Sequence, residues 1–131
     1  MITSKELMIG DWYVFQGHPY KCTASDIAAL AECEENGMPT DISEIPLTAE
    51  ILEKNGFEKG TYELPVSGKK IPKYSYAEVE GDIKEVALLP LTMNSTWSFG
   101  AVDGTHIPVL QFVHQLQHAL RHCGIEHEIK L

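Results

Sequence analysis

The segment from Ile45 to Phe57, IPLTAEILEKNGF, constrains the fold most, because it predicts a short helix with both ends defined. Thr48 is a suitable N-cap, since its hydroxyl can accept a hydrogen bond from a free amide at the helix start. Gly56 supplies the left-handed residue that often ends a helix, and Phe57 can then pack back on the helix as in a Schellman motif. The pattern predicts a helix over Thr48–Asn55 and indicates no reaction.

A longer amphipathic helix is predicted near the C-terminus, from about Pro108 to Cys123. Proline is tolerated in a first helical turn, and Gly124 provides a stop. Apolar residues recur at steps of three and four and form one stripe: Val109, Phe112, Val113, Leu116, Ala119, Leu120 and Cys123. Such a stripe is typical of a helix that packs on a sheet.

The N-terminal part predicts a β-hairpin followed by a short helix. Residues Trp12–Thr23 alternate and are rich in aromatic and β-branched types, and Gln16–Pro19 interrupts them as a turn. Ser25 can cap a helix from Asp26 to about Cys33. We expect this hairpin to have the character of a small barrel.

Further strands are predicted between the Thr48–Asn55 helix and the C-terminal helix. They are Thr61–Val66, Tyr74–Glu80, Ile83–Leu89 and Thr96–Val102, with turns at Gly81-Asp82 and Asp103-Gly104. Pro65 and Pro72 indicate strand ends or sheet edges, because proline lacks a ladder donor. The sequence thus predicts a single α+β domain over residues 1–131, with an antiparallel sheet packed by the C-terminal helix.

Three stretches carry a resemblance to a known family. IPLTAEILEKNGFEK (45–59) and FVHQLQ (112–117) are similar to paired signatures of small, uncharacterised proteins from prophages and mobile elements of gut-dwelling Bacteroidetes. Members typically begin with an ELRIGN-like phrase before a short hairpin, and residues 6–12 here read ELMIGDW. The resemblance implies a shared fold and a mobile-element origin. It implies no reaction, because the family has no assigned activity, and no functional residue carries over.

Charge and cysteine usage limit the partners and the compartment. A net charge of −9 over 131 residues disfavours direct contact with nucleic acid or adsorption to an anionic membrane. A basic protein partner, or simple solubility, fits this charge better. Cys22, Cys33 and Cys123 form an odd set without CxxC spacing. Together with an N-terminus that lacks the apolar run of a signal peptide, this predicts reduced thiols in the cytoplasm.

Three histidines form the one candidate metal site. His114, His118 and His122 stand four residues apart, and imidazoles at that spacing on a helix can hold a transition metal. A metal site needs a third ligand and second-shell support, and the sequence places neither; it predicts no cofactor. Projected around the helix, the three lie opposite Leu116, so we expect an exposed polar face. That face could equally meet a partner and respond to pH.

No catalytic motif emerges from the sequence. Cys22 lies near His18 and Cys123 near His122, but adjacency in the chain does not establish the geometry of a nucleophile and its base. We therefore expect a non-enzymatic accessory protein that acts through protein–protein contact. The alternative is a small-ligand or metal-binding protein, or a minor enzyme, with its pocket between the sheet and the C-terminal helix.

Overall fold

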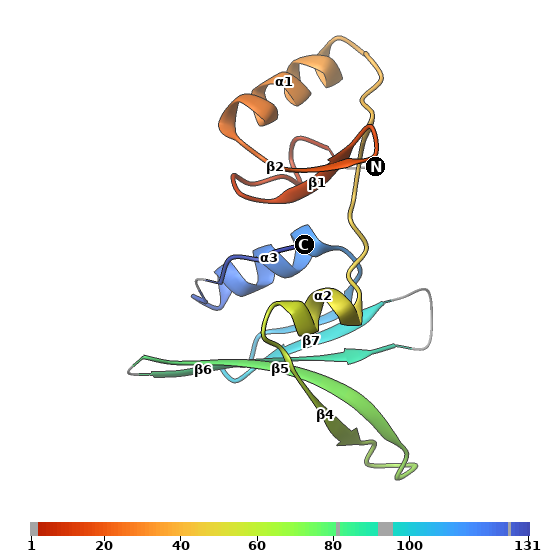
Figure 1. The fold of residues 1–131 in the computed structure, drawn as a ribbon, viewed down its shortest axis with the longest axis vertical. Coiled ribbons are helices and arrows are strands. Elements are labelled where there is room, and N and C mark those ends of the chain that lie inside the picture. Colours follow the sequence, from red (N-terminus) through yellow and green to blue (C-terminus); the bar gives the residue numbers. More distant parts are fainter. Residues whose placement is uncertain (1–2, 81, 92–95, 126) are drawn as a thin grey trace. The chain divides into compact units, whose positions relative to one another are not determined.

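The computed structural model describes residues 3–80, 82–91, 96–125 and 127–131. Three helices and eight strands lie within these ranges, and the fold is α+β with antiparallel sheets, as predicted (Figure 1). Gly81, half of a predicted turn, lies outside the described residues. Contacts divide the chain into two compact units, an N-terminal unit of residues 1–46 with 112–114 and a C-terminal unit of residues 47–111 with 115–131.

The N-terminal unit contains a three-stranded antiparallel sheet. Its strands are β1 (Trp12–Phe15), β2 (His18–Lys21) and β3 (Ile42–Ser43), in the order β2-β1-β3. The turn between β1 and β2 has two residues, Gln16 and Gly17, with φ of 49° and 78°, as a tight hairpin of right-handed twist requires.

Two details of the predicted hairpin were wrong. His18 and Pro19 belong to β2 and not to the turn. Pro19 has no amide hydrogen to donate. It is tolerated in β2 because β2 is an edge strand, which has a neighbouring strand on one side only. The described strands form an open sheet with two edges, so the hairpin is not part of a closed barrel.

Helix α1 (Ala24–Glu35) begins two residues earlier than predicted. Thr23, not Ser25, is the N-cap, since Thr23 Oγ1 accepts from the amide of Asp26 at 3.2 Å and Asp26 Oδ2 accepts from the amide of Thr23 at 3.0 Å. A reciprocal box needs a carboxylate or amide side chain at the third helical position. Thr23 has Asp26 there, whereas Ser25 would have Ala28.

The C-terminal unit begins with α2 (Ala49–Lys54), and both of its predicted ends are confirmed. The Ile51 amide donates to Thr48 Oγ1 at 3.3 Å. Gly56 has φ of 83°, and the Phe57 amide donates to the carbonyl of Leu52 at 3.0 Å, which completes a Schellman stop.

A five-stranded antiparallel sheet follows, in the order of the chain. Its strands are β4 (Glu58–Glu63), β5 (Lys70–Glu80), β6 (Asp82–Pro90), β7 (Trp97–Ala101) and β8 (His106–Leu110). β4 starts earlier than predicted, directly after the stop of α2. Pro72 lies in β5, but β6 begins to pair with β5 only at Tyr74, so Pro72 faces no partner on that side.

The predicted start of the C-terminal helix was wrong. Residues 106–110 form β8, paired with β7, and α3 spans Val113–His122. Pro108 fits β8 because this strand is at the sheet edge. Val109 is therefore exposed rather than part of the buried stripe. None of the helices in the described residues has the length and apolar composition that a membrane crossing requires.

The core of the C-terminal unit lies between its sheet and the two helices, which cover the same sheet face (Figure 1). α3 packs on this face through Leu116 and Leu120, and the sheet contributes Leu88 and Phe99; all four are at most 1% exposed. At the start of α2, Trp97 Nε1 donates a buried hydrogen bond of 3.0 Å to the carbonyl of Leu47.

Buried Asn55 joins α2 to the last residues of the chain. Its side-chain amide donates to the carbonyls of Ile51 and Lys130, both at 2.7 Å, and its Oδ1 accepts from the Lys130 amide at 2.7 Å. The same residue thus caps a helix and holds the C-terminal segment in which Ile129 is fully buried.

Asn55→Ala should destabilise the protein by about 1–3 kcal/mol, because it removes the part-buried side-chain bonds to the amide and carbonyl of Lys130, whereas the Ile51 carbonyl still accepts from the backbone amide of residue 55. Asn36 is the matched control: it also C-caps a helix and donates to the carbonyl four residues back, but it is exposed and holds no second segment. Chemical denaturation should show a clearly smaller loss of unfolding free energy for Asn36→Ala than for Asn55→Ala. Equal losses would show that the bonds to Lys130 contribute nothing.

Candidate functional site

The β1–β2 hairpin gathers three aromatic rings on one face of its sheet. Tyr13 pairs with Tyr20 in the strand register, and Phe15 lies two residues along the same strand as Tyr13. Side chains alternate along a strand, so these three share a face. The Tyr13 and Tyr20 rings stack with centroids 6.0 Å apart, and Phe15 lies 6.5 Å from Tyr20.

Helix α1 and the loop after it complete a groove beside these rings. α1 contributes Asp26, Leu30 and Cys33, and the loop contributes residues 39–41, including Asp41; Ile42 at the start of β3 also lines it. The resulting hollow has a volume of about 730 Å³ and lies entirely within the N-terminal unit. We call it the aromatic groove. Its size is that of pockets that bind small ligands or the anchor residues of a partner.

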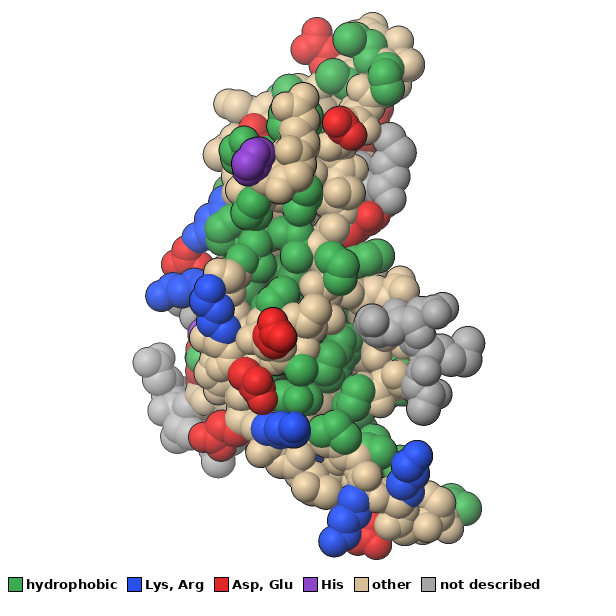
Figure 2. All heavy atoms as spheres, turned by 45° about the vertical axis from the view of Figure 1, so that its right-hand side comes forward, with side chains coloured by type: hydrophobic (Ala, Val, Ile, Leu, Met, Phe, Trp, Pro, Cys, Tyr) green, Lys and Arg blue, Asp and Glu red, His purple; other side chains and the backbone are tan. Residues whose placement is uncertain are grey.

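The rings at the groove differ in exposure. Tyr13 is buried at 7% and belongs to the small core of this unit with Leu7, Cys22 and Leu30. Tyr20 is 45% exposed, and Phe15 is 38% exposed. Figure 2 shows that hydrophobic side chains reach the surface on the face drawn there, interspersed with Asp and Glu.

Asp26 connects the helix cap to the groove. Its carboxylate accepts the Thr23 amide and also a hydrogen bond from the Tyr13 hydroxyl. Burial raises the pKa of Tyr13 to about 12, and the neighbouring Asp26 carboxylate adds to the shift. The phenol therefore stays protonated at neutral pH and acts as a donor to Asp26.

The groove lies in the more acidic unit. Residues 1–46 contain eight Asp and Glu, two Lys and no Arg, and residues 112–114 add no Asp, Glu, Lys or Arg. Lys21 borders the groove, but it pairs with Trp12 in the register, and its Nζ lies 5.3 Å from the Trp12 ring centroid. Strand alternation places that pair on the sheet face opposite to Tyr13 and Tyr20.

The predicted exposed face of histidines was wrong for His114. His114 is 3% exposed; its ring stacks on Phe112 with centroids 6.0 Å apart, and its Nε2 lies 4.0 Å from Glu6 Oε2. His118 is half-buried, and His122 is exposed. In the described ranges, no group of three or more His, Cys, Asp or Glu side chains is placed to hold a metal ion.

His118 and His122 border a second hollow, between β8 and α3 in the C-terminal unit. It has a volume of about 400 Å³, and Gln115 and Val109 also line it. His122 lies near Asp103, and the pKa of that carboxyl is lowered, mainly by hydrogen bonding from Thr105 and in part by His122. This hollow lies between the sheet and the C-terminal helix, the place that the alternative function requires.

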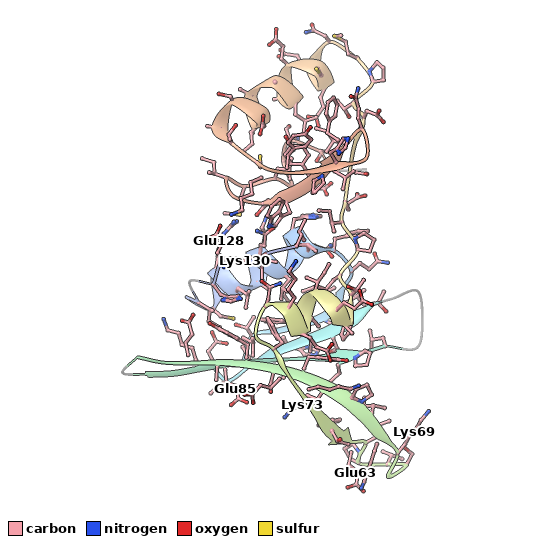
Figure 3. All side chains as sticks on the ribbon, viewed as in Figure 1. Glu63, Lys69, Lys73, Glu85, Glu128 and Lys130 are labelled. Carbon is pink, nitrogen blue, oxygen red and sulfur yellow. The ribbon has the colours of Figure 1, made fainter. Side chains whose placement is uncertain are left out.

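A third hollow, of about 420 Å³, lies on the sheet face away from α2 and α3. Lys73 and Glu85 border it, and Figure 3 shows both on that side of the sheet. Its floor contains small residues, among them Ala87, Ser98 and Gly100. Tyr62 and His106 also line it, but this lining alone does not establish the paired geometry that acid–base or nucleophilic catalysis requires.

Neither cysteine considered for catalysis is activated. Burial raises the pKa of the Cys22 thiol, with Asp26 and Asp11 adding to the shift, and burial likewise raises the pKa of Cys123. A nucleophilic cysteine needs the opposite shift, towards the thiolate. Cys33, half-buried at the groove, is also a free thiol.

The sequence pointed to part of the groove. The first hairpin is visibly rich in aromatic residues, which include Tyr13, Phe15 and Tyr20, but the sequence does not tell which of them remain exposed. It gave no sign that Asp26 and Asp41 would lie beside them. The Thr23–Asp26 capping box is a local signal that would have placed the start of α1 and hence Asp26.

Comparison of the chain with protein-family models, with characterised proteins and with solved structures finds no match.

Tyr13→Phe should alter the alkaline dependence of stability. A tyrosine of the unfolded chain ionises near pH 10, whereas folded Tyr13 holds its proton to about pH 12. The free energy of unfolding should therefore fall across that interval in the parent and fall less steeply in Tyr13→Phe. Urea denaturation at several pH values measures the slope, with Tyr62→Phe, at an exposed tyrosine of β4, as control. Identical slopes for parent and Tyr13→Phe would contradict the raised pKa of the buried Tyr13.

Proposed function

We propose that the protein is an accessory protein of a prophage or mobile element that acts in the cytoplasm through protein–protein contact and catalyses no reaction. Its mobile-element origin rests on the resemblance carried by residues 6–12, 45–59 and 112–117. The contact function rests on one observation, the aromatic groove of the N-terminal unit.

The exposed rings of the groove support this proposal. Phe15 and Tyr20 present more than a third of their surface to solvent although they lie side by side. Tyrosine and phenylalanine are enriched at protein interfaces, because each buries a large area for little loss of side-chain freedom. A partner that covered both rings would remove their exposed apolar surface from water, and this burial would favour binding.

Charge limits the kind of partner. The protein carries a net charge of −9, and the N-terminal unit has only two lysines. Phosphate backbones and anionic lipids are bound by clustered Lys and Arg. The proposal therefore involves neither direct contact with nucleic acid nor adsorption to a membrane.

Tyr20→Ala should abolish capture of the partner without unfolding the protein, because Tyr20 lies on an edge strand and is 45% exposed. Its matched control is Tyr62→Ala, which removes an exposed tyrosine from edge strand β4 of the other unit. Purified parent and variants are used as bait in a lysate of a gut Bacteroidetes strain, and captured proteins are compared by mass spectrometry. A captured protein is then purified and its affinity measured directly.

The informative result is a difference between the two variants. A protein retained by the parent and Tyr62→Ala, but lost with Tyr20→Ala, supports the groove as the contact surface. If every captured protein is retained equally by both variants, the groove is not the contact surface and the proposal fails.

The hollow between β8 and α3 favours a second candidate, a small-ligand or metal-binding protein or a minor enzyme. His118 and His122 stand one turn apart and border that hollow. Two imidazoles at this spacing can hold zinc or nickel when a third ligand is supplied. The described residues supply none, which is why contact through the aromatic groove is preferred.

Elemental analysis separates the two candidates. We expect untagged, purified protein to carry no stoichiometric zinc or nickel, because a stable site needs at least three protein ligands. Stoichiometric metal that is lost in His118→Ala, but kept in the control His106→Ala at an exposed histidine of β8, would favour the second candidate.

A further inference from the structure

We propose that the aromatic groove receives an arginine-bearing segment of the partner protein, with the guanidinium against the Tyr20 ring and near the carboxylates of Asp26 and Asp41. This inference rests on the proposed contact function and names the chemistry of the partner at the same surface. It follows from three features: the negative charge of the N-terminal unit, the aromatic and acidic side chains that line the groove, and the exposure of its outer rings.

The charge of the groove favours a cation. Two of its lining residues are aspartates, Asp26 and Asp41. The lysine at its border, Lys21, has its ammonium group over Trp12 on the opposite face of the sheet. An incoming positive group would therefore meet carboxylates and ring faces rather than the Lys21 charge.

The aromatic lining favours a cation that can also stack. A positive group within about 6 Å of a ring centroid is attracted by the negative ring face. The hairpin already uses this interaction between Lys21 and Trp12, at 5.3 Å. Tyr20 presents a comparable ring to the groove, stacked on Tyr13 and 45% exposed.

Arginine suits these two features better than lysine. Its planar guanidinium can lie flat on a ring while its edge donates two parallel hydrogen bonds to a carboxylate. Asp41 is exposed and free to rotate to such a donor, whereas Asp26 is fixed by its bonds to Thr23 and Tyr13. The groove thus combines one carboxylate that can change its orientation, Asp41, with one whose position is fixed, Asp26.

A protein segment fits the groove better than a free small cation. A hollow of about 730 Å³ exceeds what one guanidinium fills, and Phe15 beside Tyr20 offers further exposed apolar surface. Apolar side chains flanking an arginine would cover that surface, and a lone cation would leave it in water. The predicted occupant is therefore a basic segment with apolar neighbours on an exposed loop or tail.

The test compares two soluble peptides that differ only in charge. One contains arginines separated by leucines, and the other has citrulline, an uncharged isostere, in place of each arginine. Binding is measured by isothermal titration with the full chain, and contacts are mapped by amide chemical shifts. We expect the arginine peptide to bind at least about tenfold more tightly and to shift residues of β1, β2 and α1.

Variants separate the groove from the general acidity of the protein. Asp41→Asn and Glu35→Gln each remove one exposed carboxylate from the N-terminal unit, but only Asp41 lines the groove. Asp41→Asn should weaken binding of the arginine peptide about two- to fivefold, and Glu35→Gln should change it by less than about 1.5-fold. Tyr20→Leu, which keeps apolar bulk without a ring, should also weaken it, and amide spectra of each variant verify the fold.

Three results would overturn the inference: equal binding of the two peptides, equal effects of Asp41→Asn and Glu35→Gln, or binding of arginine amide as tight as that of the peptide. None of these decides the proposed function. That function fails separately, when capture of the cellular partner does not depend on Tyr20.

Discussion

The register of the β1–β2 hairpin determines which side chains the N-terminal unit buries and which it presents. Gln16 and Gly17, both with positive φ, close the hairpin in two residues and so pair Tyr13 with Tyr20 and Trp12 with Lys21. A shift of one residue would move every side chain of one strand to the other face. The stacked tyrosines would be separated, and the Lys21 charge would turn towards the groove.

Asp26 makes the groove dependent on the start of α1. The same carboxylate closes the capping box with Thr23 and accepts the hydroxyl of Tyr13. Because each of these bonds fixes the position of the carboxylate, the negative charge at the groove is held in place, and a partner of the proposed kind would meet it already positioned. Preset charges of this kind lower the ordering cost of binding. Asp41, exposed in the loop after α1, supplies the adaptable part.

The sequence predicted elements whose signals are local and missed features that depend on distant segments. Both ends of α2 followed from Thr48, Gly56 and Phe57, which act within a few residues of the helix. The strand β8 was missed because its apolar residues also suit a helix, and only pairing with β7 decides between the two. The position of His114 on its helix said nothing about Glu6, which contacts it from more than a hundred residues away.

The candidate site was predictable in its composition but not in its geometry. A crowd of aromatic residues in one hairpin is visible in the sequence, yet the burial of Tyr13 and the exposure of Tyr20 are decided by α1, which packs over only part of the sheet face. The described core of this unit has four mutually packed, buried hydrophobic side chains, Leu7, Tyr13, Cys22 and Leu30. A core of this size leaves the outer rings uncovered. Under the proposed contact function, a partner that binds only the folded unit would stabilise it by mass action, and by covering the exposed rings it would link recognition to the stability of the hairpin itself.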